Sequence, residues 1–359
     1  MAEARRAGLP LAEQDSDSLA ERVTLSPGAV ATSDALRQFV KVSEGIDGDV
    51  VGTLCAPHDT WADNPVFGPP ARLIRLRGPG PMSDERLGRA SRVVVPVRTE
   101  AYELPLLDRV GGRSETFHAS TAVLVSRARW PGVIWANLLA LGPALLGALP
   151  GPSATAPLRV MVAAVRAGTL DPGELGLKLV RRGAGSKVHP SAVVEGSWIM
   201  PGATVDAGAI VRHSIIGEGA TVEPQALCIG SVLGPGAILQ RRGFCTFGSL
   251  ETGSVCGGTM QLGYVGRQAQ LKVGAILLDQ ALGSEVRVRV DGQFFPAPLG
   301  LIGAALGSGS VVGAGVQVAA GRLIAPGTEV VASSHHLLLK PEVSAAGRYR
   351  VVDGALQPC

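Results

Sequence analysis

The sequence predicts a mainly β protein, in which a small α/β domain and a helical connector precede a parallel β-helix. Three observations predict this fold class: a six-residue repeat between about residues 188 and 330, a 17-residue step between most of its members, and an aromatic content of only 4%. A period this short is typical of proteins built from stacked units. A narrow β-helix core has room for few aromatic rings.

Each repeat unit, or hexad, reads aliphatic-x-x-x-small-x. Hexads begin at Ile199, Ile216, Leu233, Leu250, Val265 and Leu282. The step into the Val265 hexad is two residues short, and the Leu282 hexad is the poorest match because Val286 stands where a smaller residue is expected. Aliphatic residues then recur every six positions, at Leu306, Val312, Val318, Ile324 and Val330.

Three hexads form one triangular coil, with the aliphatic and the small residue of each hexad pointing inward. Gly and Pro take the corners, where a positive or fixed φ is needed. Coils stack about 4.8 Å apart because one coil cannot bury its own apolar side. Cys228 and Cys245, 17 residues apart, should therefore lie in one column as small buried residues.

Composition and charge exclude several classes of function. With 48 Gly, 25 Pro and 18% charged residues, the chain is typical of an ordered, turn-rich protein. A net charge of +3 is too small to indicate nucleic acid or an anionic membrane as the main partner. No Cys-x-x-Cys pair is present, so no zinc or other metal site is expected. Residues 1–22 are charged and lack the apolar segment of a secretory signal, which predicts a flexible arm and a cytoplasmic protein.

Residues 23–128 read as the small α/β domain. A Ser or Asp cap precedes an apolar helical stripe at Ser33–Val40. Four β-branched, turn-bounded segments predict strands: Asp49–Cys55, Ala71–Leu76, Arg92–Val97 and His118–Val125. Loop positions are predicted for Gly78–Met82 and for the scattered acids Asp59, Asp63 and Asp108.

Residues 129–186 form an apolar helical connector. Trp130–Pro150 carries no charge and is almost long enough to span a membrane. Gly142 and Pro143 should break it into a helix of about ten residues and a second short piece. Spanning the membrane, or contacting its surface through residues 130–150, are alternatives to the favoured interpretation of a buried connector. Pro157–Arg182 then reads as two helices.

The predicted β-helix covers residues 187–333, with a loop insertion at 287–298. Val290-Asp-Gly292 signals a turn in the insertion and is followed by Phe294-Phe295. Such a loop is a usual place for binding residues. The C-terminal tail, 334–359, contains two possible strands, Glu342–Ser344 and Tyr349–Val352.

A family resemblance rests on four motifs: Gln261-Leu-Gly-Tyr264-Val-Gly266, the insertion near Asp291-Gly292, Leu299-Gly-Leu-Ile-Gly303 and Ala325-Pro-Gly327. With the hexads, these resemble the hexapeptide-repeat transferases, in particular the sugar-1-phosphate nucleotidylyltransferase/acetyltransferase proteins, in which an α/β half precedes a left-handed β-helix. The resemblance implies a homotrimer, a sugar phosphate or nucleotide sugar as substrate, and acetyl-CoA or another acyl-CoA as donor. It also implies a groove between neighbouring β-helices, where main-chain amides from Gly303 to Gly315 could hold the ligand.

The sequence departs from this family at both of its activities. The family's acetyltransferase base is a His, and Gln261 takes its place; an amide cannot serve as a general base near neutral pH. The Gly-rich phosphate loop of the nucleotidylyltransferase half is missing, so the N-terminal unit is at best a degenerate remnant.

The candidate catalytic residues are therefore Gln261, Tyr264 and His213, the last in a corner where it could act as a base or be a plain surface imidazole. Arg267 and Lys272 could form a basic strip for an anionic ligand, with Gly303 and Gly315 as further ligand-binding positions. His335-His336 lacks a third metal ligand.

Two hypotheses of different classes follow. The first is a transferase that moves an acyl or nucleotidyl group onto a sugar phosphate or nucleotide sugar. The second is a non-catalytic β-helix scaffold or sugar-nucleotide-binding protein descended from such an enzyme. Gln261 and the missing phosphate loop favour the second, whereas Tyr264 and the insertion favour the first.

Overall fold

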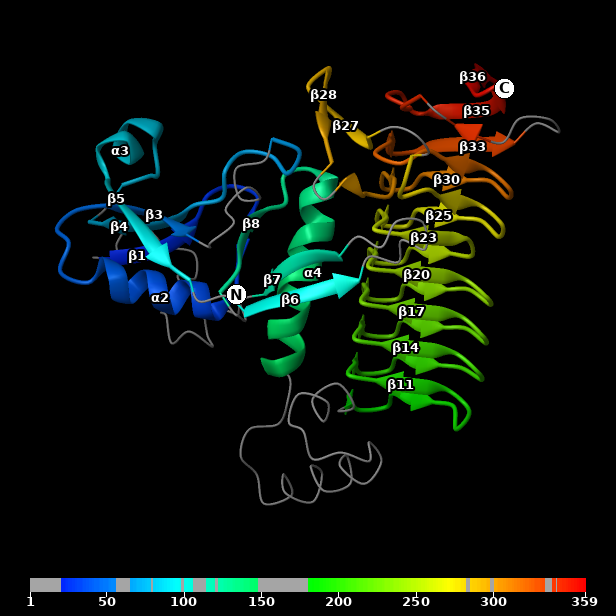
Figure 1. Cartoon of the computed structure of the whole chain (residues 1–359), viewed down its shortest axis with the longest axis horizontal. Coiled ribbons are helices and arrows are strands. Elements are labelled where there is room, and N and C mark those ends of the chain that lie inside the picture. Colours follow the sequence, from blue (N-terminus) through cyan, green and yellow to red (C-terminus); the bar gives the residue numbers. More distant parts are fainter. Residues whose placement is uncertain are drawn as a thin grey trace. The chain divides into compact units, whose positions relative to one another are not determined.

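The computed structural model describes residues 21–55, 65–78, 80–97, 100–105, 114–119, 122–147, 180–281, 285–297, 300–332, 338–339 and 341–359. The chain divides into two compact units, Met1–Pro143 and Ala144–Cys359 (Figure 1). The division falls inside the helix α4 (Trp130–Gly147). The domain boundaries expected from the sequence therefore remain predictions.

The first unit contains a four-stranded mixed sheet in the order β1 (Glu21–Leu25), β4 (Leu73–Arg77), β3 (Val50–Cys55), β5 (Ser91–Pro96). Two-stranded pairs are formed by β2 (Ala29–Ala31) with β8 (Leu124–Ser126) and by β6 (Glu100–Pro105) with β7 (Ser114–Ala119). The helices are α2 (Ser33–Ser43), α3 (Asp84–Arg89) and α4. Predicted strands 49–55, 71–76 and 92–97 match within two residues, whereas 118–125 is two strands, β7 and β8.

The cap of helix α2 is Thr32, one residue before the first of the expected cap residues, Ser33. The Thr32 hydroxyl accepts a hydrogen bond from the Ala35 N–H at 3.4 Å and so caps the helix. Phe39, on the buried face of α2, packs against β3 at Gly52, where a Cβ would lie 2.5 Å from the ring. Glycine at this strand position is therefore a packing requirement.

Arginines and acids hold one edge of the first unit together. Arg86 makes a close ion pair with Asp49, Nε to Oδ2 2.6 Å, and the Asp49 carboxylate also accepts from the Arg77 N–H at 2.8 Å. The hydrogen bond from Arg86 lowers the pKa of Asp49 below its ordinary value, although burial acts in the opposite direction. Asp49 therefore keeps its charge in the folded protein, and with it this ion pair, at pH values where an exposed Asp would already take up a proton.

The helix α4 differs from its expectation. It runs as one helix from Trp130 to Gly147, through Gly142 and Pro143, so the expected break is wrong. Trp135 is buried and lies 6.5 Å from the Phe67 ring, centroid to centroid. Among the residues that the structure describes, no helix has both the length and the apolar character required to cross a bilayer.

The second unit is the predicted parallel β-helix, whose coils stack one above another (Figure 1). Three sheets form its walls. The first sheet contains β10 (Lys187–Val188), β13 (Thr204–Val205), β16 (Thr221–Val222), β19 (Ile238–Leu239), β22 (Val255–Cys256), β25 (Gln270–Leu271), β30 (Val311–Val312), β33 (Thr328–Ala332), β35 (Gly347–Val352) and, antiparallel at its end, β36 (Ala355–Pro358). The second contains β11 (Val193–Glu195), β14 (Ile210–Arg212), β17 (Leu227–Ile229), β20 (Phe244–Thr246), β23 (Thr259–Gln261), β26 (Ile276–Leu277), β31 (Gln317–Val318) and β34 (Leu338–Leu339). The third contains β9 (Arg181–Arg182), β12 (Trp198–Ile199), β15 (Ile215–Ile216), β18 (Val232–Leu233), β21 (Ser249–Leu250), β24 (Tyr264–Val265), β29 (Ala305–Leu306) and β32 (Leu323–Ile324).

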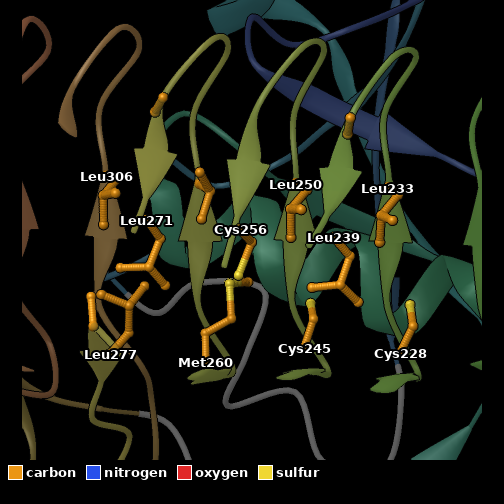
Figure 2. Close-up of a cluster of buried hydrophobic side chains, with 14 of the residues drawn as sticks. Cys228, Leu233, Leu239, Cys245, Leu250, Cys256, Met260, Leu271, Leu277 and Leu306 are labelled. Carbon is orange, nitrogen blue, oxygen red and sulfur yellow. The ribbon is translucent and has the colours of Figure 1, made fainter. Parts of the chain in front are cut away.

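The core of the β-helix consists of the inward columns that the hexads predict. Ile199, Ile216 and the small residues Ala203 and Ala220 are fully buried. Figure 2 shows Leu233, Leu250 and Leu306 in one column, in which Val265 of β24 lies between Leu250 and Leu306. Cys228 lies directly beside Cys245 in the register of β17 and β20, which confirms their predicted stacking.

The shortened coil is also confirmed. Phe244 of β20 pairs with Thr259 of β23, a step of 15 residues. Gly257 and Gly258 make the shorter corner possible, since a Cβ on Gly258 would lie 2.2 Å from the Ala275 carbonyl oxygen. The shortfall is thus absorbed by two residues without side chains.

Two expectations for the second unit are wrong. The Leu282 hexad is not a coil: Val265 pairs with Leu306, and Val286 is buried at the foot of an antiparallel hairpin formed by β27 (Arg287–Val290) and β28 (Gln293–Pro296). Arg181 and Arg182 do not end a helix but form β9, where the Arg181 guanidinium lies 4.4 Å from the centre of the Trp198 ring. Residues 157–179 of the two predicted helices lie outside the described residues. In the tail, β35 and a bridge from Val343 to Ile324 correspond to the two predicted strands.

Candidate functional site

The corner between the second and third sheets is the most unusual edge of the β-helix. Its successive turn positions are Gly196, His213, Gly230, Phe247 and Leu262, and His213, Phe247 and Leu262 have φ values of 47°, 51° and 49°. Residues other than glycine seldom adopt such values. Phe247 covers Gly230 of the coil before it, where a Cβ would lie 2.5 Å from the ring.

A ladder of buried serines builds the lower part of this corner. The Ser197 hydroxyl accepts from the Ser214 N–H, the Ser214 hydroxyl accepts from the Ser231 N–H, and each bond is 3.1 Å long. The Ser231 hydroxyl in turn accepts from the Gly248 N–H. Because buried amides need a partner, the ladder fixes the register of successive corners up to the coil that carries Gln261.

The insertion leaves and re-enters the β-helix at the coil after Gln261. Gln261 ends β23 with its side chain partly exposed, and the next residue, Leu262, donates its N–H to the Thr246 carbonyl at 3.0 Å. On its return the chain places the Gly303 N–H 3.0 Å from the Leu262 carbonyl oxygen. A Cβ on Gly303 would lie 2.4 Å from the Gln261 carbonyl oxygen, so only glycine permits this approach.

Asp279 occupies the same corner where the insertion departs. Its carbonyl accepts from the Ile302 N–H at 3.2 Å, which closes the two ends of the insertion on each other. Burial raises the pKa of the half-buried Asp279 carboxyl above its ordinary value, although a hydrogen bond to its own backbone opposes this. A carboxylate in such surroundings is a better proton acceptor than an exposed one.

The sequence analysis missed Asp279. One signal was present: Asp279 is the first charged residue after the inward Leu277, where the hexad pattern is interrupted.

The structure gathers only part of the predicted site in one place. Tyr264 begins β24 on the outer face of the third sheet, and Gly303 lies against Gln261. His213 is on the same edge but three coils from Leu262, on the order of 14 Å at the usual strand spacing. It therefore shares an edge with Gln261 but not a site.

The other three predicted ligand-binding residues, Arg267, Lys272 and Gly315, lie at the other two corners. Arg267 is at the turn from the third to the first sheet, where its carbonyl accepts from the Gly309 N–H. Lys272 and Gly315 are at the turn from the first to the second sheet, with the Lys272 Nζ 2.5 Å from the Gln270 Oε1. No single position on one chain therefore touches all of these residues.

Metal-ligating side chains do not gather in the part of the chain that the structure describes, where no group of three or more His, Cys, Asp or Glu side chains is close enough to share an ion. Burial raises the pKa of the Cys245 thiol to about 12, and the Cys228 and Cys256 thiols are raised in the same direction. These cysteines are therefore core residues and not nucleophiles. His335 and His336 lie outside the described residues.

Comparison with known proteins gives structural neighbours only. No protein-family model matches the sequence, and no curated protein matches it by sequence. Among solved structures, the chain is similar to the acetyltransferase domain of PglB from Neisseria gonorrhoeae FA1090, with 17% identity and a TM-score of 0.18 over 55% of this chain and 66% of that domain. A second structure of that domain, in complex with acetyl coenzyme A, matches with 16% identity and a TM-score of 0.16 over 52% of this chain and 61% of the domain. This chain thus spans slightly less than two thirds of that domain in either structure.

Two further neighbours are acetyltransferases by name. The polysialic acid O-acetyltransferase OatWY matches with 14% identity and a TM-score of 0.21, over 50% of this chain and 88% of that one. The polySia-specific acetyltransferase NeuO matches with 8% identity and a TM-score of 0.21, over 51% and 86%. Likenesses at these TM-scores carry no argument about the function of this chain.

Proposed function

We propose that the protein transfers an acyl group from an acyl-CoA, such as acetyl-CoA, to a hydroxyl or amino group of a sugar phosphate or nucleotide sugar. The observation that carries the proposal is the corner at which Gln261, Asp279 and Gly303 meet. There a half-buried carboxyl, a partly exposed amide side chain and the returning backbone share one edge of a rigid β-helix. Sites held by such fixed elements can position reacting groups accurately.

Asp279 is the base in this proposal. Its carboxylate takes a proton from the acceptor hydroxyl or neutral amino group as the acceptor atom bonds to the thioester carbonyl carbon, and the carbon–sulfur bond breaks. The proton held by Asp279 then passes to the departing CoA thiolate, which restores the carboxylate. Gln261 would donate its amide N–H to an oxygen of the substrate, a role that needs no titratable group.

A homotrimer completes the proposed site. Candidate residues lie at three corners of one chain, so a ligand near Gln261 reaches Arg267, Lys272 or the Gly315 backbone only across a boundary between copies. Outward positions of the second and third sheets are strongly apolar and only partly buried, and they include Ile210, Leu227, Phe244, Ile215 and Val232. Apolar wall positions of this kind are suited to contact with a second copy.

A second candidate function is non-catalytic binding of a sugar nucleotide. Gln261 favours it, because the residue that the resemblance assigns as base cannot accept a proton. Under this alternative Asp279 is a structural acid and the late coils retain only the binding site.

The test is acceptor-dependent release of CoA thiol from acetyl-CoA, measured with a thiol reagent on the full chain. Glucosamine 1-phosphate and an amino-sugar nucleotide serve as acceptors. The wild type should release thiol, and Asp279→Asn should lower the rate by about 10²–10⁴-fold, the usual range for loss of a general base. Asp206→Asn, a partly buried acid at another corner, is the matched control and should leave the rate unchanged.

The pH profile separates a catalytic from a structural role. Because the pKa of Asp279 is raised above 3.8, the wild-type kcat/KM should fall on the acid side at a pH above that value. This limb should be missing from the residual activity of Asp279→Asn. Binding of acetyl-CoA without acceptor-dependent thiol release would favour the non-catalytic function, and an unchanged profile in the variant would remove Asp279 from the mechanism.

A further inference from the structure

The β27–β28 hairpin has two faces of opposite character. Cross-strand register pairs Val288 with Phe295 on one face, and Arg287 with Pro296 and Arg289 with Phe294 on the other. Val288 and Val290 are 1% and 6% exposed, whereas Phe294 is 46% exposed. The hairpin thus buries its valines and presents two arginines and an aromatic ring on its open face.

A third arginine joins this face from the β-helix. Arg322 donates through Nη1 to the Arg287 carbonyl at 2.8 Å, and its guanidinium carbon lies 5.5 Å from the centre of the Phe294 ring. The neighbouring Gly321 brings the β-helix backbone close to the hairpin, since a Cβ there would lie 2.5 Å from the Arg287 oxygen. Arg322 is therefore held in place, and it covers one side of the Phe294 ring.

An acid of the C-terminal tail, Glu342, also lies against these arginines. Glu342 Oε2 lies 3.9 Å from Arg289 Nη1, a long contact. Burial raises the pKa of Glu342, although the charges of Arg289 and Arg322 both act to lower it. Glu285 before β27 and Asp291 in the turn lie at the two ends of the strand, beyond the stretch that bears the arginines. Three guanidinium groups, those of Arg287, Arg289 and Arg322, therefore lie close to the Phe294 ring on this face.

We infer that this face, formed by Arg287, Arg289, Arg322 and Phe294, binds a nucleoside diphosphate. Guanidinium groups pair with phosphate oxygens through charge-assisted, often bidentate hydrogen bonds. The side of the Phe294 ring that Arg322 leaves open accepts a stacked base. The three arginines would pair with the two linked phosphates, and the Phe294 ring beside them would stack on the base.

Two kinds of molecule contain a nucleoside diphosphate: a CoA thioester, in its ADP portion, and a nucleotide sugar. The inference goes beyond the proposed function, because an active transferase and a non-catalytic binder would both use such a site. It can be measured without any acyl transfer.

The experiment is isothermal titration of the full chain with ADP, UDP, CoA and inorganic pyrophosphate. Binding of at least one nucleotide is expected. Arg289→Gln should weaken it by about tenfold, equal to about 1.4 kcal/mol. Phe294→Ala should weaken nucleotides by about tenfold, as loss of a stacked base does, and leave pyrophosphate unchanged. Arg241→Gln, an exposed arginine at a different corner, is the control and should have no effect.

The outcomes are separable. Tighter binding of CoA than of UDP would identify the acyl donor as the source, and the reverse would identify a nucleotide sugar. The inference is overturned if no nucleotide binds at about 5 mM, above the weakest affinity expected for a specific site. It is also overturned if Arg241→Gln weakens binding as much as Arg289→Gln, or if Phe294→Ala weakens pyrophosphate equally. Circular dichroism of each variant verifies that it is folded.

Discussion

Replacing Gly303 by alanine tests whether the returning chain closes the candidate site as tightly as the structure indicates. The new Cβ would lie 2.4 Å from the Gln261 carbonyl oxygen and 2.7 Å from that of Leu262, about 1 Å closer than ordinary contacts allow. Both neighbours are backbone atoms in a paired coil, so they cannot rotate away. The strand must shift instead.

The cost follows from what that shift disrupts. Overpacking alone costs about 1–3 kcal/mol. A displacement of the strand by about 1 Å also weakens the hydrogen bonds that Gly303 makes with Leu262 and Gly321, each about 1 kcal/mol. We expect a total of about 2–5 kcal/mol.

Gly309→Ala is the matched control, since it adds the same methyl group one turn later. Gly309 has φ +70° and open space around its Cβ position, so the cost is that of a left-handed alanine, about 1–2 kcal/mol. Urea unfolding followed by circular dichroism gives both values. Hydrogen exchange at the Gly303 and Gly321 amides shows whether the loss is local, as expected for a repeat array in which coils contact only their neighbours.

The reasoning is refuted if the two variants lose equal stability, or if Gly303→Ala leaves exchange at the Gly321 amide unchanged. Either result would mean that the insertion closes more loosely and that Gln261 and Asp279 do not share a rigid corner.

Two more predictions concern titratable groups. Cys359 is exposed and should react quickly with a thiol reagent. Cys228, Cys245 and Cys256 are buried and have raised pKa values, so they should react only on unfolding. Mass spectrometry locates the labelled residues, and fast labelling of any of these three would contradict their assignment to the core. Because the folded pKa of Asp49 is lowered, its ion pair stabilises the first unit above the unfolded value of 3.8, and this is lost as the pH falls through the folded value. Stability curves of the wild type and Asp49→Asn should therefore differ at neutral pH and converge as the pH falls below the unfolded value, and a gap that stays constant throughout an acid titration would exclude this role.

The β-helix could be predicted because its period is a local property of the chain. An inward aliphatic residue, a small residue four positions later and a 17-residue step are sufficient to place Leu233 beside Leu250. The same pattern failed at Val286, which is buried by a hairpin that the hexad rule does not describe. An apolar residue at the expected position shows that a side chain is buried, but not which element buries it.

Tertiary packing overrode local preferences in two other places. Gly142 and Pro143 predict a break, but α4 continues through them. Arg181 resembles the basic end of a helix, but it pairs as a strand beside Trp198, where its cation also faces the indole ring. A short stretch of sequence around Arg181 does not contain its strand partner Trp198, and a short stretch around Pro143 does not contain the rest of α4.

The candidate site could also be predicted only in part from the sequence. Gln261 could be found because the resemblance to the hexapeptide-repeat transferases points to its motif, whereas Asp279 could not, since its burial depends on how the insertion closes. The geometry of the helix also explains why sequence neighbours mislead here. Arg267 follows Gln261 by six residues and therefore lies at the next corner, while Gly303, far along the chain, returns to Gln261 itself.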